Sequence, residues 1–345
     1  CSPADLGPTT KTAVAQLARA SFAEAKRQAS LGGISPLGNL KDDRVYLFSG
    51  TYDGVTPQGV VDALFDFYAA TDKAALAPGN IDYNRTFPAP HTMVRDGFER
   101  PTGGVVGDCT PTPARSAAKN TYIDDCEPIA NRQQAQSQCL CPASQAKATP
   151  GTPCPPSNKQ ATCRDLADVD LAGAILKQIY GGPALKAGRV PLPEAAVQAF
   201  DQRHVFSHFS GMPYNARQNA SMAKEGYVYI PAACKDGRRC RLHVAFHGCQ
   251  QGGQTDRRPG HAGNLYAKFA GYNEWAKAND IIVLYPQVEA RSATAPSNPA
   301  GCWDWWGQNY THEGYHTQRG KQVKAVAQMI NILLGGEPRL AVPPE

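Results

Sequence analysis

The sequence predicts an α/β fold in which helices cover both faces of a mostly parallel sheet. The main observation is that short apolar runs, typical of buried strands, alternate with longer segments of helical periodicity. The predicted strands lie at residues 45–48, 80–87, 205–209, 227–230, 241–246 and 281–285. The predicted helices lie at residues 10–30, 58–70, 168–180, 263–279 and 320–334. The chain contains no internal repeat.

The elements of the first half follow from residue spacing and from turn residues. Residues 10–30 are rich in Ala, Lys and Gln at helical spacing, whereas Val45–Phe48 is a short apolar run that ends at a turn. Pro57 stands at a predicted first helical position, where an N–H is not needed, and residues 58–70 have an amphipathic pattern. A second strand is expected within residues 80–87.

The elements of the second half are defined in the same way. Apolar residues recur at intervals of three and four between 168 and 180, which is typical of a helix with one buried face. Residues 281–285 form a continuous apolar run, as expected for a strand buried on both faces. The helix at 320–334 ends at two glycines, which are common helix terminators.

The length of 345 residues is enough for one large α/β domain or two ordinary ones. We expect a single catalytic domain over residues 1–335. A long segment rich in Pro, Gly, Ser and Cys lies at 97–165, and loops of this length are unusual in a compact domain. It is predicted to be a surface insertion held by disulfides, with a lid or substrate-binding loop as the alternative. Residues 336–345 are predicted to be a tail.

Charge and hydropathy exclude some functional classes. The formal net charge is +5, and the 35 Lys and Arg residues are scattered rather than gathered in one stripe, so a nucleic-acid partner is not expected. There is no run of 18 apolar residues that would indicate a transmembrane helix. We expect a monomer.

Eleven cysteines, several of them in loops, indicate disulfides and an oxidising compartment. Cys234 and Cys240 flank a short loop, and Cys109 and Cys126 a longer one. Four more cysteines crowd one segment: Cys139, Cys141, Cys154 and Cys163. A zinc site would need paired Cys-x2-Cys or histidine partners, which are absent, so disulfides are favoured and neither a metal nor a cofactor is expected. The connectivity stays open.

The segment Arg241–Gln251 is an apolar strand that stops abruptly at His247-Gly248. One interpretation is a strand followed by a simple turn. The other is the loop with which α/β-hydrolases donate a backbone N–H to their oxyanion hole. Acyl transfer builds up negative charge on an oxygen, and a fixed N–H beside a glycine can stabilise that charge.

Asp53 and His91 follow two successive predicted strands. Asp53 lies just beyond the strand at 45–48, where open α/β sheets place catalytic groups, although a turn or helix-capping role would also suit it. His91 lies in a loop flanked by proline, where a histidine can also be incidental. An acid after one strand and a histidine after the next is the order in which α/β-hydrolases supply the last two members of their catalytic triad.

In that superfamily the oxyanion strand comes early and the acid and histidine come last, whereas here Asp53 and His91 precede His247. The order indicates a circular permutation. Over roughly residues 40–335 the chain resembles the circularly permuted, extracellular poly(3-hydroxybutyrate) depolymerases and their esterase relatives. The motifs that carry the resemblance are Ser49–Asp53, Pro90–Thr92, Gly226–Pro231, Leu242–Cys249, Gly271–Ala276, Ile282–Gln287 and Asn298–Trp305.

The resemblance implies a secreted serine esterase that hydrolyses polyesters through an acyl-enzyme. It implies that Asp53 is the triad acid, that His91 is the general base and that the N–H of Cys249 is an oxyanion donor. It also implies a Cys249–Cys302 bridge, and it places Trp303 at the rim of a crevice for a polyester strand. Exposed aromatic side chains independently suit a flat, apolar polyester, whereas Trp305 or Trp306 is expected in the core.

The nucleophile of such an enzyme is missing. No Gly-x-Ser-x-Gly occurs in the chain, and the nearest sequence, Gly33–Gly38, has the wrong spacing and contains Pro36 where a helix should begin. We expect the serine and its strand to lie upstream of Cys1, and the printed chain alone to lack activity. Two alternatives are a non-catalytic polyester- or surface-binding derivative, and a short-chain or aryl esterase on the same fold.

Overall fold

The structure is a computed structural model. It describes residues 10–51, 53, 55–69, 76–77, 79–87, 89, 91–96, 107–108, 123–125, 170–185, 188–202, 220–235, 238–252, 264–290, 298–304 and 314–335. The chain divides into two compact units, unit 1 (Cys1–Leu185) and unit 2 (Lys186–Glu345). The assignment of residues 1–335 to one catalytic domain stays a prediction.

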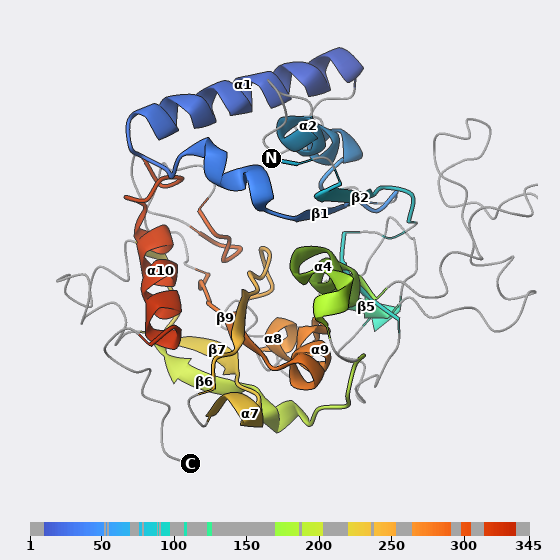
Figure 1. Cartoon of the computed structure of the whole chain (residues 1–345), viewed down its shortest axis with the longest axis vertical. Coiled ribbons are helices and arrows are strands. Elements are labelled where there is room, and N and C mark those ends of the chain that lie inside the picture. The colour runs from blue at the N-terminus through green and yellow to red at the C-terminus, as the bar shows by residue number, and fades with distance from the viewer. Residues whose placement is uncertain are drawn as a thin grey trace, which may run out of the picture. The chain divides into compact units, whose positions relative to one another are not determined.

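Unit 1 combines helices with two small parallel sheets (Figure 1). Its elements are α1 (Lys11–Ser30), η2 (Leu37–Asp42), β1 (Val45–Phe48), α2 (Gln58–Ala69), β2 (Ile81–Asn84), β3 (Met93–Arg95), β4 (Gly107–Asp108), β5 (Ile123–Asp125), α4 (Leu171–Tyr180) and η5 (Gly182–Ala184). Strand β1 pairs in parallel with β2, and β5 lies in parallel between β3 and β4. The β1–β2 pairing matters most, because it brings the carboxyl ends of both strands to one edge.

Helices α1 and α4 show why the periodicity predicted them. In α1 the hydroxyl of Thr10 accepts a hydrogen bond from the N–H of Ala13, and the buried residues Val14, Ala18 and Phe22 recur every four positions. Helix α4 begins later than predicted because Asp170 caps it. That carboxylate accepts from the N–H of Gly173 at 3.0 Å.

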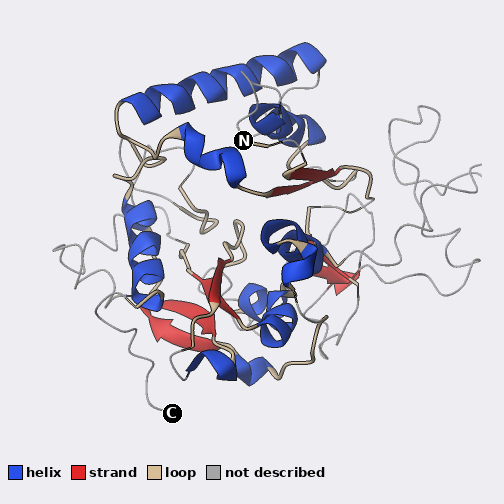
Figure 2. Cartoon of the chain, viewed as in Figure 1, coloured by secondary structure: helices blue, strands red, loops and turns tan. Residues whose placement is uncertain are grey.

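Unit 2 is built on a four-stranded sheet with the order β6-β7-β9-β8. Figure 2 distinguishes strands, drawn in red, from helices, drawn in blue. The elements of unit 2 are η6 (Glu194–Ala196), β6 (Gln198–Asp201), β7 (Glu225–Tyr229), α7 (Ala232–Lys235), β8 (Arg241–Val244), α8 (Leu265–Phe269), α9 (Tyr272–Asn279), β9 (Ile281–Tyr285) and α10 (Lys321–Leu333). Strands β8 and β9 are parallel, whereas β7 is antiparallel to both β6 and β9. This sheet is therefore mixed rather than mostly parallel.

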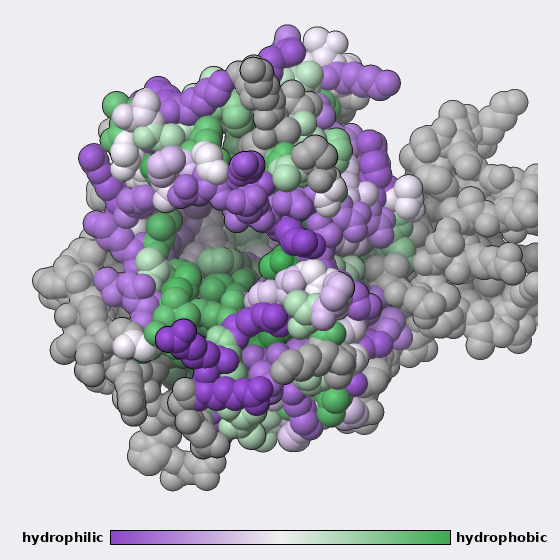
Figure 3. Space-filling model, viewed as in Figure 1, coloured by the Kyte–Doolittle hydropathy of each residue, from purple (hydrophilic) through white to green (hydrophobic). Residues whose placement is uncertain are grey.

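Helices cover both faces of the unit 2 sheet, as predicted. Val228 of β7 and Leu284 of β9 share one core cluster with Met329 of α10. Adjacent positions on a strand point to opposite faces. Tyr285 accordingly faces away from α10, and its hydroxyl donates to Asn273 of α9 at 2.8 Å. Apolar surface beside α10 is visible in the space-filling view (Figure 3).

The structure corrects several predicted bounds. The helix predicted at 263–279 is two helices, α8 and α9, because Gly271 between them has φ +90° and interrupts the helical backbone. The strand predicted at 80–87 is limited to Ile81–Asn84, and the strand predicted at 241–246 ends at Val244. Strands β3, β4, β5 and β6 were not predicted.

Several predictions fall on residues that the structure does not describe. These are the strand at 205–209, the tail at 336–345 and most of the segment at 97–165, apart from β4 and β5. None of the helices among the described residues has the length and apolar character that a bilayer crossing requires.

Two histidines are buried in unit 2, one in β8 and one beyond its end. The ring of His243 lies 4.9 Å from that of Tyr272, and His247 is 2% exposed. Burial lowers the pKa of each histidine from 6.5 to about 4, because an imidazolium ion is poorly solvated there. Both rings are therefore neutral in the folded protein at pH 7.

We expect the stability of unit 2 to fall as the pH drops from about 6.5 to about 4. In the unfolded chain each of these histidines binds a proton near pH 6.5, whereas in the folded chain it does so only near pH 4. The stabilisation that depends on the neutral rings is therefore complete above pH 6.5 and is lost as the pH falls toward 4. The loss approaches about 3 kcal/mol for each ring. Denaturant unfolding across this pH range measures it. His243→Phe should flatten the pH dependence, and His316→Gln, at an exposed position, should not. An unchanged dependence in His243→Phe contradicts the assignment.

Candidate active site

An acid and a histidine meet in unit 1, at the edge where β1 and β2 end. Asp53 lies five residues beyond β1, and His91 lies seven residues beyond β2. Oδ2 of Asp53 is 2.9 Å from Nδ1 of His91. The sequence predicted both residues from their places after successive strands, and the structure brings their side chains into hydrogen-bond contact.

The carboxylate of Asp53 is held at both oxygens. Oδ1 accepts hydrogen bonds from the backbone N–H groups of Val55 at 2.9 Å and Thr56 at 2.8 Å, which leaves Oδ2 for His91. The turn-capping role and the histidine-facing role considered for Asp53 are thus performed together. The side chain of Asp53 is 11% exposed and that of His91 is 42% exposed, so the histidine is the accessible member of the pair.

The two loops that carry this pair are in close backbone contact. The N–H of Thr51 donates to the carbonyl of Phe87 at 2.9 Å, and that of Ser49 donates to Asn84 at 3.0 Å. A Cβ at Gly50 would overlap the carbonyl oxygen of Ala89, so only glycine permits this approach. The glycine of the Ser49–Asp53 motif therefore has a packing function.

The arrangement of Asp53 and His91 determines where the imidazole carries its proton. A carboxylate only accepts hydrogen bonds, so Nδ1 of a neutral His91 is the protonated nitrogen and Nε2 holds the lone pair. This is the tautomer that a general base requires, since Nε2 can then take a proton from a nucleophile. The pair has the chemistry of a base and its orienting acid.

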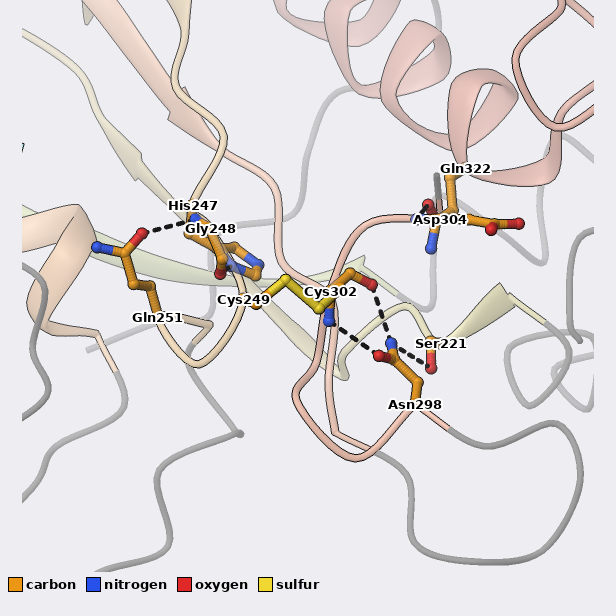
Figure 4. Close-up of a disulfide and its surroundings, with 9 residues drawn as sticks. All are labelled: Ser221, His247, Gly248, Cys249, Gln251, Asn298, Cys302, Asp304 and Gln322. Carbon is orange, nitrogen blue, oxygen red and sulfur yellow. Dashed lines mark hydrogen bonds between the residues drawn. A yellow bond between two sulfur atoms is a disulfide. The ribbon is translucent and has the colours of Figure 1, made fainter. Parts of the chain in front are cut away.

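In unit 2 the chain beyond β8 is held by a buried histidine (Figure 4). Nδ1 of His247 lies 2.7 Å from the carbonyl oxygen of Gly248, and Nε2 accepts from the N–H of Val288 at 3.2 Å. Nδ1 is therefore the donor and the ring is neutral, in agreement with its lowered pKa. A ring with both nitrogens occupied is a support for the loop rather than a general base.

A disulfide joins this loop to a second loop of unit 2. Cys249 is bonded to Cys302, as the resemblance implied, and Cys234 is bonded to Cys240. Asn298 reinforces the connection, because its side chain accepts from the N–H of Cys302 and donates to the carbonyl of the same residue, both at 2.9 Å (Figure 4). The remaining cysteines lie outside the described residues.

The backbone N–H groups at the loop tip differ in their partners. The N–H of Gly248 donates to Oε1 of Gln251 at 2.6 Å. Cys249 is exposed, and its N–H has no acceptor among the residues that the structure describes. A donor of this kind, fixed by a disulfide and open to solvent, can stabilise a developing oxyanion.

Two aromatic side chains adjoin this tip. The ring of Trp303 is partly buried and lies 5.0 Å from that of Phe246 in an edge-to-face arrangement. Phe246 is 49% exposed, unlike its buried neighbours Ala245 and His247. Phe246 was not among the predicted site residues, although the alternation beyond β8 places it opposite those neighbours. Trp305 and Trp306 lie outside the described residues. No group of His, Cys, Asp and Glu within the described ranges is suited to holding a metal ion.

Comparison with known proteins finds no matching family model. A poly(3-hydroxybutyrate) depolymerase of Delftia acidovorans is 31% identical over 311 residues, which cover 89% of this chain and 46% of that protein. A polyhydroxybutyrate depolymerase of Talaromyces funiculosus is 27% identical over 314 residues, which cover 88% of this chain and 69% of that protein. The chain thus spans about half the length of the first relative and about two thirds of the second.

Two solved structures resemble this one. A PHB depolymerase from Penicillium funiculosum matches with a TM-score of 0.59 and 25% identity, over 92% of this chain and 78% of that chain. A serine-to-alanine variant of a PHB depolymerase, complexed with an R3HB trimer, matches with a TM-score of 0.61 and 24% identity, over 96% of this chain and 80% of that chain. The chain is therefore a homologue of poly(3-hydroxybutyrate) depolymerases over almost nine tenths of its length.

Proposed function

We propose that this chain belongs to a secreted serine esterase that hydrolyses poly(3-hydroxybutyrate)-type polyesters. The observation that carries the proposal is the 2.9 Å contact between Asp53 and His91 at the common edge of β1 and β2. A surface that only bound polyester would have no need of an acid that fixes the tautomer of an accessible histidine. The pair therefore favours an enzyme over a binding derivative.

In the proposed mechanism, Nε2 of His91 takes the proton of a serine hydroxyl while that oxygen attacks the ester carbonyl. Asp53 stabilises the imidazolium that forms, and a backbone N–H stabilises the oxyanion, which is the role that the resemblance gives to Cys249. His91 then protonates the leaving alcohol, which gives an acyl-enzyme. A water molecule activated by the same histidine hydrolyses this intermediate and releases the acid.

We further propose that the serine is not among these 345 residues. Nucleophile elbows have the sequence Gly-x-Ser-x-Gly at a strand-to-helix turn, and the chain contains none. The nearest candidate, Ser35, lies in the connection between α1 and η2 and so follows a helix rather than a strand. In this proposal the serine strand precedes β1. The order of segments is then permuted, because Asp53 and His91 come before the loop that carries Cys249.

The proposed substrate class rests on the homologues and on the aromatic surface of unit 2. Both curated relatives are named as depolymerases of this polyester, and one similar structure is complexed with an R3HB trimer. Phe246 and Trp303 offer apolar surface beside the Cys249 loop, which suits an uncharged polyester strand. The two disulfides of the described residues support secretion, since such bonds persist in oxidising compartments.

The first test removes the proposed base and acid from the whole gene product. His91→Ala and Asp53→Asn should each lower kcat for a soluble butyrate ester by roughly 10⁴-fold and abolish the clearing of a polyhydroxybutyrate suspension. His316→Gln is the control and should retain both activities. Hydrolysis that persists in both variants contradicts the site, and ester hydrolysis without clearing in the unmodified protein indicates a short-chain or aryl esterase.

The second test concerns the aromatic surface. Phe246→Ala should raise KM for 3-hydroxybutyrate oligomers by roughly tenfold, as expected for the loss of one aromatic contact, with little effect on a short soluble ester. Val323→Ala changes a similarly exposed apolar side chain on α10 and should leave both KM values unchanged. Equal effects of the two substitutions on oligomer binding would argue against a substrate-binding role for Phe246.

A further inference from the structure

A single side-chain amide in unit 1 connects the loops that carry Asp53 and His91. Gln58 is the first residue of α2. Its Nε2 donates to the carbonyl oxygen of Arg85 at 2.7 Å and lies 3.3 Å from that of Ser49, a weaker second bond. Ser49 is the first residue of the loop that leads to Asp53, and Arg85 is the first residue of the loop that leads to His91.

Because Gln58 lies at the start of α2, its hydrogen bonds also affect the position of Asp53. Asp53 accepts from Val55 and Thr56 just before α2 begins, so the start of the helix and the carboxylate form one hydrogen-bonded segment. The backbone bonds between the two loops lie close to the strand ends. Gln58 adds a contact from the helix itself, which fixes the helix start, and with it Asp53, relative to the loop of His91.

The chemistry of the bridge requires an NH2 group. Both partners of Gln58 are carbonyl oxygens, and a primary amide offers two N–H donors, one for each. A glutamate of the same shape would present only acceptors to these two oxygens and would repel them. A methionine of similar length would neither attract nor repel them. The two replacements therefore separate the effect of the donors from the effect of side-chain size.

We propose that Gln58 is a positioning residue that sets the contact between Asp53 and His91 by holding their loops together. This role rests on the proposed function of the pair in ester hydrolysis. Gln58 touches neither residue of the pair in any hydrogen bond of the described structure, so it acts through the loops. Its loss should impair the chemical step more than substrate binding, because a small misplacement of a base slows proton transfer.

The experiment compares Gln58→Met and Gln58→Glu with Leu64→Ala, a change at an exposed position of the same helix, in the whole gene product. Both Gln58 variants should lower kcat for a soluble butyrate ester by roughly 10- to 100-fold, with KM within about twofold of the unmodified protein. The downfield proton resonance of Nδ1 of His91, followed by NMR, should weaken or shift in both. Leu64→Ala should change neither quantity.

Measuring both kcat and the Nδ1 resonance separates failure of the proposed esterase function from failure of the positioning role of Gln58. If the unmodified protein hydrolyses no ester, the proposed function fails, and the Nδ1 resonance alone decides the role of Gln58. An unchanged resonance in both Gln58 variants overturns the positioning role, whether or not kcat falls. Loss of folding in both variants, seen by near-ultraviolet circular dichroism, also overturns it, because Gln58 would then support the fold in general.

Discussion

The parallel pairing of β1 with β2 is the constraint on which the candidate site depends. It brings the carboxyl ends of both strands to one edge, so residues that are 38 positions apart in the chain share a hydrogen bond. The loops approach closely enough that Gly50 has no room for a Cβ beside Ala89. The acid–histidine geometry is thus a consequence of strand register and of one glycine, rather than of the side chains of the pair alone.

Two histidines that follow strands have opposite roles because their surroundings differ. His91 faces a carboxylate and is 42% exposed, which suits a group that exchanges protons. His247 is 2% exposed and has both ring nitrogens occupied by backbone groups, so it stays neutral and supports the loop that carries Cys249. Position after a strand is therefore a weak guide to function until the partners of each nitrogen are known.

The sequence predicts those features that depend on local pattern. Val45–Phe48 and Ile281–Tyr285 have their predicted bounds because turn residues or a helix end flank each apolar run. The break at Gly271 escapes prediction because the apolar pattern continues across it and only the backbone angle reveals it. The bridging role of Gln58 could not be predicted for a different reason. Its acceptors are 9 and 27 residues away, and no spacing rule links an amide at a helix start to such distant carbonyls.

Active-site labelling can decide whether Asp53 and His91 activate a serine. The whole gene product would be treated with a fluorophosphonate ester, and the modified residue would be identified by peptide mass spectrometry. We expect one labelled serine, located outside these 345 residues, and no label in His91→Ala. A label on a serine within these residues, or equal labelling in His91→Ala, would contradict this expectation.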